Sequence, residues 1–219
     1  MTRKFFWWSV LLAAVLGVAT FAFEMQRRPQ AVRDARTAAP AGLQAVLWPQ
    51  ARPIAPFHMS TQNGANFGPE QFLGQWSFVF FGYLSCPDVC PTTLQTLADF
   101  RRRLLAADPA AARYRFVFVS VDPANDTAER MGAYIGYFDR DFLGLTGEAG
   151  ELARLARSMG AAYAERVDER GVRTVDHSTS VLLVDPAGRA VGGLPAPHDP
   201  ARMLVLFQAL LRYLGGSSA

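Results

Sequence analysis

Beyond its first 50 residues the chain has almost no excess of either charge. The 219 residues carry a net charge of +3, but residues 1–50 hold six basic and two acidic groups, leaving sixteen basic and seventeen acidic groups for residues 51–219. A groove for a phosphate backbone needs clustered basic charge. The one basic run, Arg101–Arg103, falls in an expected helix, where a solvated face explains it. The composition therefore argues against nucleic acid as a partner.

Cysteine is scarce, so all thiol chemistry has to come from one pair, Cys86 and Cys90. They lie in the stretch 81–91 (Phe-Gly-Tyr-Leu-Ser-Cys-Pro-Asp-Val-Cys-Pro), where a strand-like run gives way to a helix-like one. Such a pair can close a disulfide, exchange electrons with another dithiol, or bind a soft metal. Pro91 suits a first helical turn, which places both thiols near a helix N-terminus, where unpaired N–H groups and the helix dipole favour thiolate. We interpret the pair as a reactive site with a lowered cysteine pKa rather than an inert structural pair.

Internal repeats are also lacking, and half of the residues are apolar, so we expect one domain with an N-terminal appendage. The uncharged run 5–23 follows Arg3 and Lys4 and is long enough to cross ~30 Å of hydrocarbon as a helix. We interpret residues 1–28 as a membrane anchor with its span at about 5–23. A cleaved signal peptide is the alternative, because Thr20–Ala22 offers a weak cleavage site.

Residues 29–53 mix Pro, Ala, Arg and Gln with little apolar periodicity, which is typical of a flexible tether. Four arginines in residues 27–36 outnumber the two basic residues before the span, so the positive-inside rule alone would leave the domain in the cytoplasm. Long domains, however, translocate largely regardless of charge. We therefore expect a single-pass protein of the cytoplasmic (inner) membrane with its domain in the periplasm.

Strand and helix patterns alternate through residues 54–219, the expected domain. This order predicts a mixed α/β sheet with helices on its faces, in a thioredoxin-like fold with an N-terminal β-hairpin extension. The Cys pair then falls beyond the carboxyl end of a strand, where reactive loops gather in α/β sheets. The expected elements are a hairpin around Asn63–Gly64, strands at 76–83, 114–121 and 181–184, an edge strand near Val191, and helices at 92–105, 127–138, 148–159 and 200–214.

The three histidines occupy different settings. His58 is expected to be a partly buried strand residue, and His198, in a turn before the last helix, to be solvated or to help cap that helix. His177 opens the loop before the 181–184 strand, and in a thioredoxin-like arrangement that loop faces the Cys loop. Two thiolates and one imidazole would then form a soft site of low coordination, which suits copper.

The residues alone leave the metal open. A structural zinc site uses four protein ligands, whereas Cys86, Cys90 and His177 supply three. An oxygen from an aspartate could complete a zinc site, while Cu(I) would not need it; the candidates are Asp88, Asp122 and Asp176. Asp176 could instead accept a hydrogen bond from the His177 ring without contacting the metal, although neighbouring strand residues point to opposite faces. A polar loop role for His177, without metal, is equally compatible with the pattern.

Four stretches of the chain together resemble the Sco/SenC family of copper proteins. They are the motif 83–94 (Tyr-Leu-Ser-Cys-Pro-Asp-Val-Cys-Pro-Thr-Thr-Leu), residues 119–127, residues 175–177 with the strand and turn that follow, and the hairpin 56–64. The resemblance spans about residues 54–214. It departs at Leu84–Ser85, where family members often have Thr-His, and in the short, charged region before His177.

The resemblance implies a thioredoxin-like domain, tethered to the membrane by one span, in which Cys86, Cys90 and His177 bind one copper ion as Cu(I) or Cu(II). It implies a role in assembling the binuclear copper centre of cytochrome c oxidase, by delivering copper, by keeping the cysteines of that centre reduced, or both. The implied partners are the copper-centre subunit of the oxidase and an upstream copper donor.

Two enzyme functions are alternatives. A thiol-disulfide oxidoreductase would use Cys86 and Cys90 as a redox dithiol without metal in turnover. Two features argue against this as the only role. Thioredoxin-type enzymes usually have two residues between their cysteines, whereas this chain has three. They also have a cis-proline in the loop that faces the cysteines, whereas this chain has His177-Ser-Thr there. A peroxidase is less well supported, because nothing in the sequence marks a peroxide pocket.

Overall fold

We analysed a computed structural model, which describes residues 39–167, 171 and 173–216. The expected anchor, with its span at about 5–23, lies outside the described residues. Among the helices that are described, none combines the length and apolar character needed to cross a membrane.

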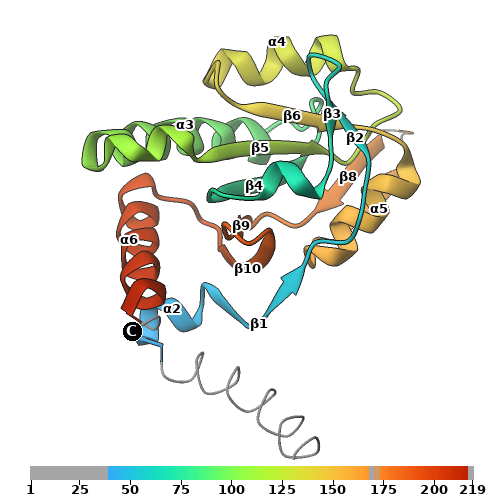
Figure 1. Cartoon of the computed structure of the whole chain (residues 1–219). Coiled ribbons are helices and arrows are strands. Elements are labelled where there is room, and N and C mark those ends of the chain that lie inside the picture. Colours follow the sequence, from blue (N-terminus) through green and yellow to red (C-terminus); the bar gives the residue numbers. More distant parts are fainter. Residues whose placement is uncertain (1–38, 168–170, 172, 217–219) are drawn as a thin grey trace, which may run out of the picture.

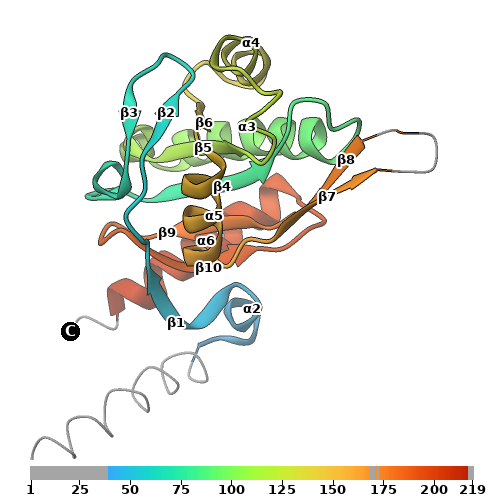
Figure 2. The same cartoon turned by 90° about the vertical axis from the view of Figure 1, so that its right-hand side faces the viewer.

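An eight-stranded sheet runs through the middle of the domain, in the order β1-β10-β9-β4-β5-β6-β2-β3 (Figures 1 and 2). Its centre is formed by β4, β5 and β6, which run parallel, and by β9, which pairs antiparallel with β4. The strand bounds are β1 Leu47–Pro53, β2 Met59–Thr61, β3 Asn66–Phe67, β4 Ser77–Gly82, β5 Arg115–Ser120, β6 Leu143–Thr146, β9 Val181–Val184 and β10 Arg189–Leu194.

Helices cover both faces of the sheet and bury two apolar clusters. One face carries α3, α4 and α6, whose inner residues join the first cluster. The other face carries α5 together with the β2–β3 segment, and their apolar residues form the second cluster. The helices are α2 Ala41–Gln44, α3 Val89–Ala107, α4 Ala128–Phe138, α5 Ala149–Ser158 and α6 Pro200–Gly216, with short 3-10 turns η1 Pro69–Phe72 and η2 Pro109–Arg113.

The central strand β4 shows how the sequence produces this layering. Phe78 and Phe80 point into the first cluster, while Val79 and Phe81 point into the second. All four are buried, as expected for a strand covered on both faces, so β4 is apolar throughout rather than alternating. The rings of Phe78 and Phe116 stack at 4.7 Å between centroids, which adds a specific aromatic contact between β4 and β5.

The strand and helix pattern expected from the sequence is largely confirmed. The hairpin around Asn63–Gly64 is present as β2 and β3, and it joins the main sheet through β6. The seven other elements expected within the domain, apart from the edge strand, match β4, α3, β5, α4, α5, β9 and α6 with ends shifted by a few residues. The fold is a mixed α/β fold of the expected class.

The expected tether over residues 29–53 is wrong for its second half. Residues 41–44 form α2, and β1 pairs antiparallel with β10. Val46 and Leu47 are buried there, and Gly192 permits the approach, because a Cβ at that position would lie 2.0 Å from the Val46 carbonyl oxygen. The strand near Val191 is consequently not an edge strand, since β1 lies outside it.

Two further strand regions were not expected. β6 spans only four residues, one of them Gly144, whose missing side chain leaves room for Met131 of α4. β7 (Tyr163–Val167) and β8 (Arg173–His177) pair as a separate two-stranded ribbon that projects from the body of the domain (Figure 2). The last residue of this ribbon is His177, one of the expected ligands.

Candidate metal centre

The two cysteines lie on the short connection between β4 and α3. β4 ends at Gly82 and α3 begins at Val89, so Cys86 lies in the loop and Cys90 in the first helical turn. The Cys86 N–H donates to the Tyr83 carbonyl at 3.2 Å, closing a turn. The Cys90 N–H lies 3.5 Å from the Cys86 sulfur. The loop thereby holds the first sulfur over the start of the helix.

Close packing fixes the position of Cys90. Its side chain is fully buried in the first apolar cluster, whereas Cys86 is partly exposed. A Cβ on Gly82 would lie 2.8 Å from the Cys90 sulfur and 2.8 Å from a Phe118 ring carbon. Only glycine therefore fits at the end of β4 while Cys90 keeps this position.

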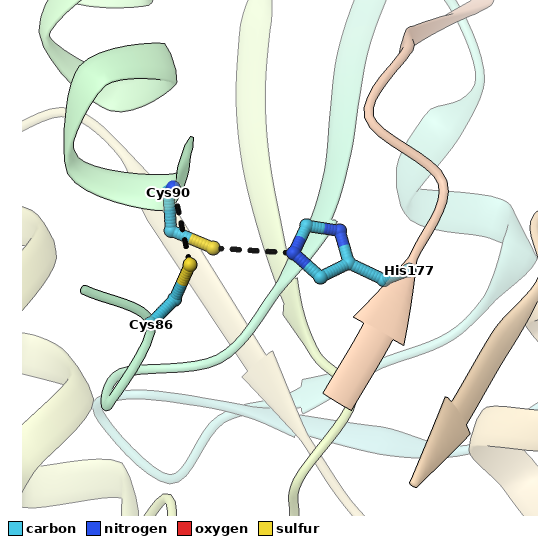
Figure 3. Close-up of side chains that lie close together, drawn as sticks. All are labelled: Cys86, Cys90 and His177. Carbon is cyan, nitrogen blue, oxygen red and sulfur yellow. Dashed lines mark hydrogen bonds between the residues drawn. The ribbon is translucent and has the colours of Figure 1, made fainter. Parts of the chain in front are cut away.

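His177 reaches the same place from the other end of the chain, as the last residue of β8 (Figure 3). Its Nε2 lies 3.4 Å from the Cys90 sulfur, and its Nδ1 lies 3.1 Å from the Ser178 carbonyl. A carbonyl only accepts, so this contact places the ring proton on Nδ1 and turns the Nε2 lone pair toward the sulfur. The ring lies edge-on to Phe80 and Tyr83, with centroids 5.8 and 6.0 Å away.

The electrostatics of Cys90 differ from expectation. We expected the helix N-terminus to lower the cysteine pKa, but burial raises the pKa of the Cys90 thiol well above its usual value, and the neighbouring Cys86 adds to this effect. Desolvation is the largest cause of this shift, because the Cys90 side chain has no exposed surface. In the metal-free chain Cys90 is therefore a thiol at neutral pH, with its S–H available to the Nε2 of His177.

The buried carboxylate of Asp126 is hydrogen-bonded to the backbone of the Cys loop. Asp126 is 1% exposed, and its Oδ2 accepts from the Leu84 N–H at 3.1 Å and from the Ser120 hydroxyl at 2.7 Å. Burial raises the pKa of Asp126, although these two hydrogen bonds oppose the shift. The role of Asp126 was not predicted from the sequence. Its sequence signal was weak: Asp126 is a polar residue six positions after Ser120, the serine that ends β5.

The aspartates considered as additional ligands do not join the sulfurs. Asp176 pairs with Arg166 across the β7–β8 ribbon, on the face opposite to its neighbour His177. Asp122 is buried and accepts from the Asn125 side chain at 2.8 and 3.0 Å. Asp88 is exposed and lies 3.5 Å from the Thr92 hydroxyl. None of the three supplies an oxygen to the cluster of sulfur and nitrogen atoms.

The other two histidines are also placed differently from expectation. His58 is exposed and precedes β2 by one residue, so it is not a partly buried strand residue. His198 is half-buried rather than solvated, and its Nε2 lies 2.9 Å from the Thr179 carbonyl. Burial lowers the pKa of His198, so the neutral ring is favoured.

The ligand atoms of Cys86, Cys90 and His177 all lie within 4.8 Å of one another. Two sulfurs and one imidazole nitrogen make a soft donor set, and one ion could contact all three after small side-chain movements. A hard cation such as Mg²⁺ or Ca²⁺ would find no oxygen ligand among these three side chains. The residues thus fit a soft metal ion.

Comparison with known proteins agrees with this site. The chain is 36% identical over 154 residues to a protein of Stutzerimonas stutzeri named as a copper-binding protein, covering 69% of this chain and 74% of that one. It is 39% identical over 149 residues to the mitochondrial SCO2 homolog of Bos taurus, covering 64% of this chain and 56% of the relative. The chain therefore spans only about half the length of the bovine protein.

Solved structures share the fold. The structure of Bradyrhizobium japonicum ScoI with copper bound matches with a TM-score of 0.63 at 31% identity, covering 72% of this chain and 99% of that one. Arabidopsis thaliana ScoI with copper bound matches with a TM-score of 0.66 at 27% identity, covering 74% and 98%. The model of the SCO1/SenC family matches residues 48–212. This range includes both cysteines and His177, and it covers the whole central sheet apart from Leu47, the first residue of β1. This chain is a member of the SCO1/SenC family.

Proposed function

We propose that this chain binds one copper ion through Cys86, Cys90 and His177 and supports assembly of the binuclear copper centre of cytochrome c oxidase. The observation that carries the proposal is the convergence of three soft ligand atoms within 4.8 Å, from segments almost ninety residues apart. Three donors without an oxygen suit copper, as Cu(I) or Cu(II), better than structural zinc, which takes four. The copper-bound state of two related structures supports the same choice.

The geometry suits release of copper as well as binding. Cys86 lies on a loop and is partly exposed, while Cys90 is enclosed by Gly82 and Phe118. A dithiol of the acceptor can therefore exchange with the Cys86 sulfur first, while Cys90 and His177 still hold the ion. This order favours delivery over storage. The acceptor we propose is the copper-centre subunit of the oxidase, and an upstream copper donor loads the site.

A titration of the full chain with Cu(I) under anaerobic, reducing conditions tests the proposal. We expect one equivalent to bind, and His177→Ala to weaken binding at least about tenfold, the scale on which metal sites respond to the loss of a supporting group. His58→Ala is the matched control, because that imidazole is exposed and outside the cluster. Equal binding by the wild type and His177→Ala would remove His177 from the site. Loading with Cu(II) should give a sulfur-to-copper charge-transfer band that weakens in Cys90→Ser, which keeps only the Cys86 sulfur.

A second function, reduction of the acceptor's disulfide, is favoured by the proximity of the two sulfurs. The Cys86 thiolate would attack the target disulfide, forming a mixed disulfide and releasing one target thiolate. Cys90 would then displace the second target thiolate, so that two electrons pass to the target and Cys86 and Cys90 become a disulfide. Incubating the reduced chain with an oxidised copper-centre peptide tests this function. The function requires that Cys90→Ser stop at the mixed disulfide and that His177→Ala remain active.

We also propose that residues 5–23 anchor the protein in the cytoplasmic (inner) membrane with the domain in the periplasm. The support is the uncharged apolar run behind Arg3 and Lys4. Membrane fractionation with protease added to spheroplasts distinguishes the orientations: an external domain is degraded, while a cytoplasmic one survives. The mass of the N-terminal peptide shows whether the segment is retained.

A further inference from the structure

His177 is the last residue of β8, and the three residues that follow it belong to no strand. The direction of its ring therefore depends on how the backbone of residues 178–180 is held. One anchor is a set of hydrogen bonds between Ser178 and Ala162, in which the Ser178 N–H donates to the Ala162 carbonyl at 2.8 Å and the Ala162 N–H donates to the Ser178 hydroxyl at 2.9 Å. These bonds hold the side of the loop that faces β7.

The opposite side of the loop is held by His198. Its Nε2 lies 2.9 Å from the carbonyl oxygen of Thr179, two residues after the candidate ligand. Because a carbonyl only accepts, Nε2 carries the proton and Nδ1 carries the lone pair. Nδ1 is buried and has no hydrogen-bond partner within the described part of the chain. The ring is therefore held as a neutral donor, and its polar contact among the described residues is the Thr179 carbonyl in the loop after His177.

The support for His198 is itself rigid. Pro197 precedes it and Asp199 follows it, and the Asp199 side chain accepts from the Arg202 N–H at 2.7 Å at the start of α6. α6 in turn packs on the sheet through Phe207, whose ring meets those of Trp76 and Phe78. A donor fixed to a packed helix can hold a loop more firmly than one on a mobile side chain, since little entropy is lost when its bond forms.

His198 also borders α3, the helix that carries Cys90. Together with Pro197 it lines a hollow of about 220 Å³ whose opposite wall is formed by Asp88, Val89 and Thr92 at the start of α3. It thus lies between the two ligand-bearing parts of the chain, close to the first turn of α3 and bonded to the loop after β8. Because His198 lines this hollow, a substituted side chain at position 198 has room.

The geometry points to His198 as a positioning residue for the copper site: its Nε2–H holds the Thr179 carbonyl and thereby aims the His177 ring at the sulfurs. This inference rests on the proposed function, because its effect is measured through copper binding. It assigns a role to the turn before α6, which contributes no ligand. Supporting residues that orient a metal ligand typically change metal affinity 10–100-fold when they are removed.

Two substitutions separate hydrogen bonding from packing. His198→Phe keeps a ring of similar size but cannot donate, whereas His198→Gln places an amide N–H near the position of Nε2. We expect His198→Phe to weaken Cu(I) binding about tenfold and to shift the Cu(II) charge-transfer band, and His198→Gln to restore both. His58→Phe is the matched control and should leave both unchanged. The full chain is used throughout, with thermal unfolding of the copper-free form recorded for each variant.

The outcomes separate this inference from the proposed function. If the wild type binds no copper, the proposed function fails. If the wild type binds copper and His198→Phe binds equally well, the positioning role is overturned. Equal losses in His198→Phe and His198→Gln would assign the effect to packing and would also overturn it. A measurement on the wild type alone, nitrogen NMR of the imidazoles, must find the His198 proton on Nε2; a proton on Nδ1 overturns the inference even where a variant fails to fold.

Discussion

The exposure of the two sulfurs differs more than their spacing in sequence suggests. Cys86 is partly exposed on the loop, while Cys90 has no exposed surface, and burial raises its pKa. Alkylating reagents attack thiolates they can reach. In the reduced, copper-free chain at neutral pH we expect N-ethylmaleimide to label Cys86 at least about tenfold faster than Cys90, as read by peptide mass spectrometry. Equal labelling rates in the folded chain would contradict the burial of Cys90; in denaturant the rates should converge.

The raised pKa of Cys90 also predicts how copper binding depends on pH. Copper binds thiolate, so a thiol that is protonated at neutral pH must release its proton on binding. Because the pKa of Cys90 lies above the range tested, its proton is displaced throughout, and affinity rises with pH by at least about tenfold per unit from about pH 6 to about pH 8. Calorimetry in buffers of different ionisation enthalpy counts the protons released. An affinity independent of pH would show that Cys90 is not a ligand.

Among the elements, the loop from β4 to α3 depends on a residue that follows β5. Asp126→Ala leaves the part-buried Leu84 N–H and the buried Ser120 hydroxyl without their acceptor, and leaving a buried polar group unpaired costs about 1–3 kcal/mol. We expect the free energy of unfolding of the copper-free chain, measured by urea denaturation, to fall by about that amount. Asp126→Asn retains a carbonyl acceptor and should lose less.

The same pair of variants tests the sign of the pH dependence. Burial raises the pKa of Asp126 above its ordinary value of 3.8, so the folded chain holds this proton more tightly than the unfolded chain. The contribution of Asp126 to stability is therefore complete below that ordinary pKa and declines as pH rises through the raised one. Asp126→Asn should remove this decline. A wild type whose stability rose more steeply with pH than that of Asp126→Asn would contradict the assignment.

The elements that could be predicted are those with a strong local pattern. β4, β5 and β9 are continuous apolar runs, and α3 to α6 have helical spacing or caps, so their sequences alone indicate them. β1 was missed because its residues are mostly exposed, and two of them are prolines. It is a strand because β10 offers an edge to pair with, which is a tertiary cause. The β7–β8 ribbon was missed because the residues of β7 are mostly exposed and show no apolar pattern.

At the site, the candidate ligands could be predicted from the sequence, whereas the residues that hydrogen-bond to their loops could not. The spacing of Cys86 and Cys90 indicated a thiol site, and the order of elements placed His177 opposite them. The contribution of Asp126 and the contact of His198 depend on pairings between residues 42 and 19 positions apart, which no local pattern reveals. Burial likewise decided the pKa of Cys90 against the expected influence of the helix N-terminus.

For the molecule as a whole, the segment before the hairpin is an integral part of the sheet. Gly192 of β10 pairs with Leu47 of β1, and a methyl group at Gly192 would overlap the carbonyl of Val46, the residue before β1. We expect Gly192→Ala to lower the free energy of unfolding by about 1–3 kcal/mol, the usual cost of overpacking, as measured by urea denaturation. Gly136→Ala, on the exposed side of α4 with nothing near its Cβ, is the control and should be neutral or stabilising. Equal stabilities of the two variants would mean that β1 is not held against β10.

The outermost strands of the sheet, β1 and β3, have a consequence for how the domain meets other proteins. β1 carries Pro49 and Pro53, and its register against β10 is interrupted, while β3 has only two residues. Prolines, irregular pairing and short length all make a strand a poor template for another chain. Recruitment of a partner by extension of the sheet is therefore disfavoured at both borders, and so is self-association into larger sheets. A partner of this domain is therefore expected to bind through side chains rather than through backbone pairing with an edge strand.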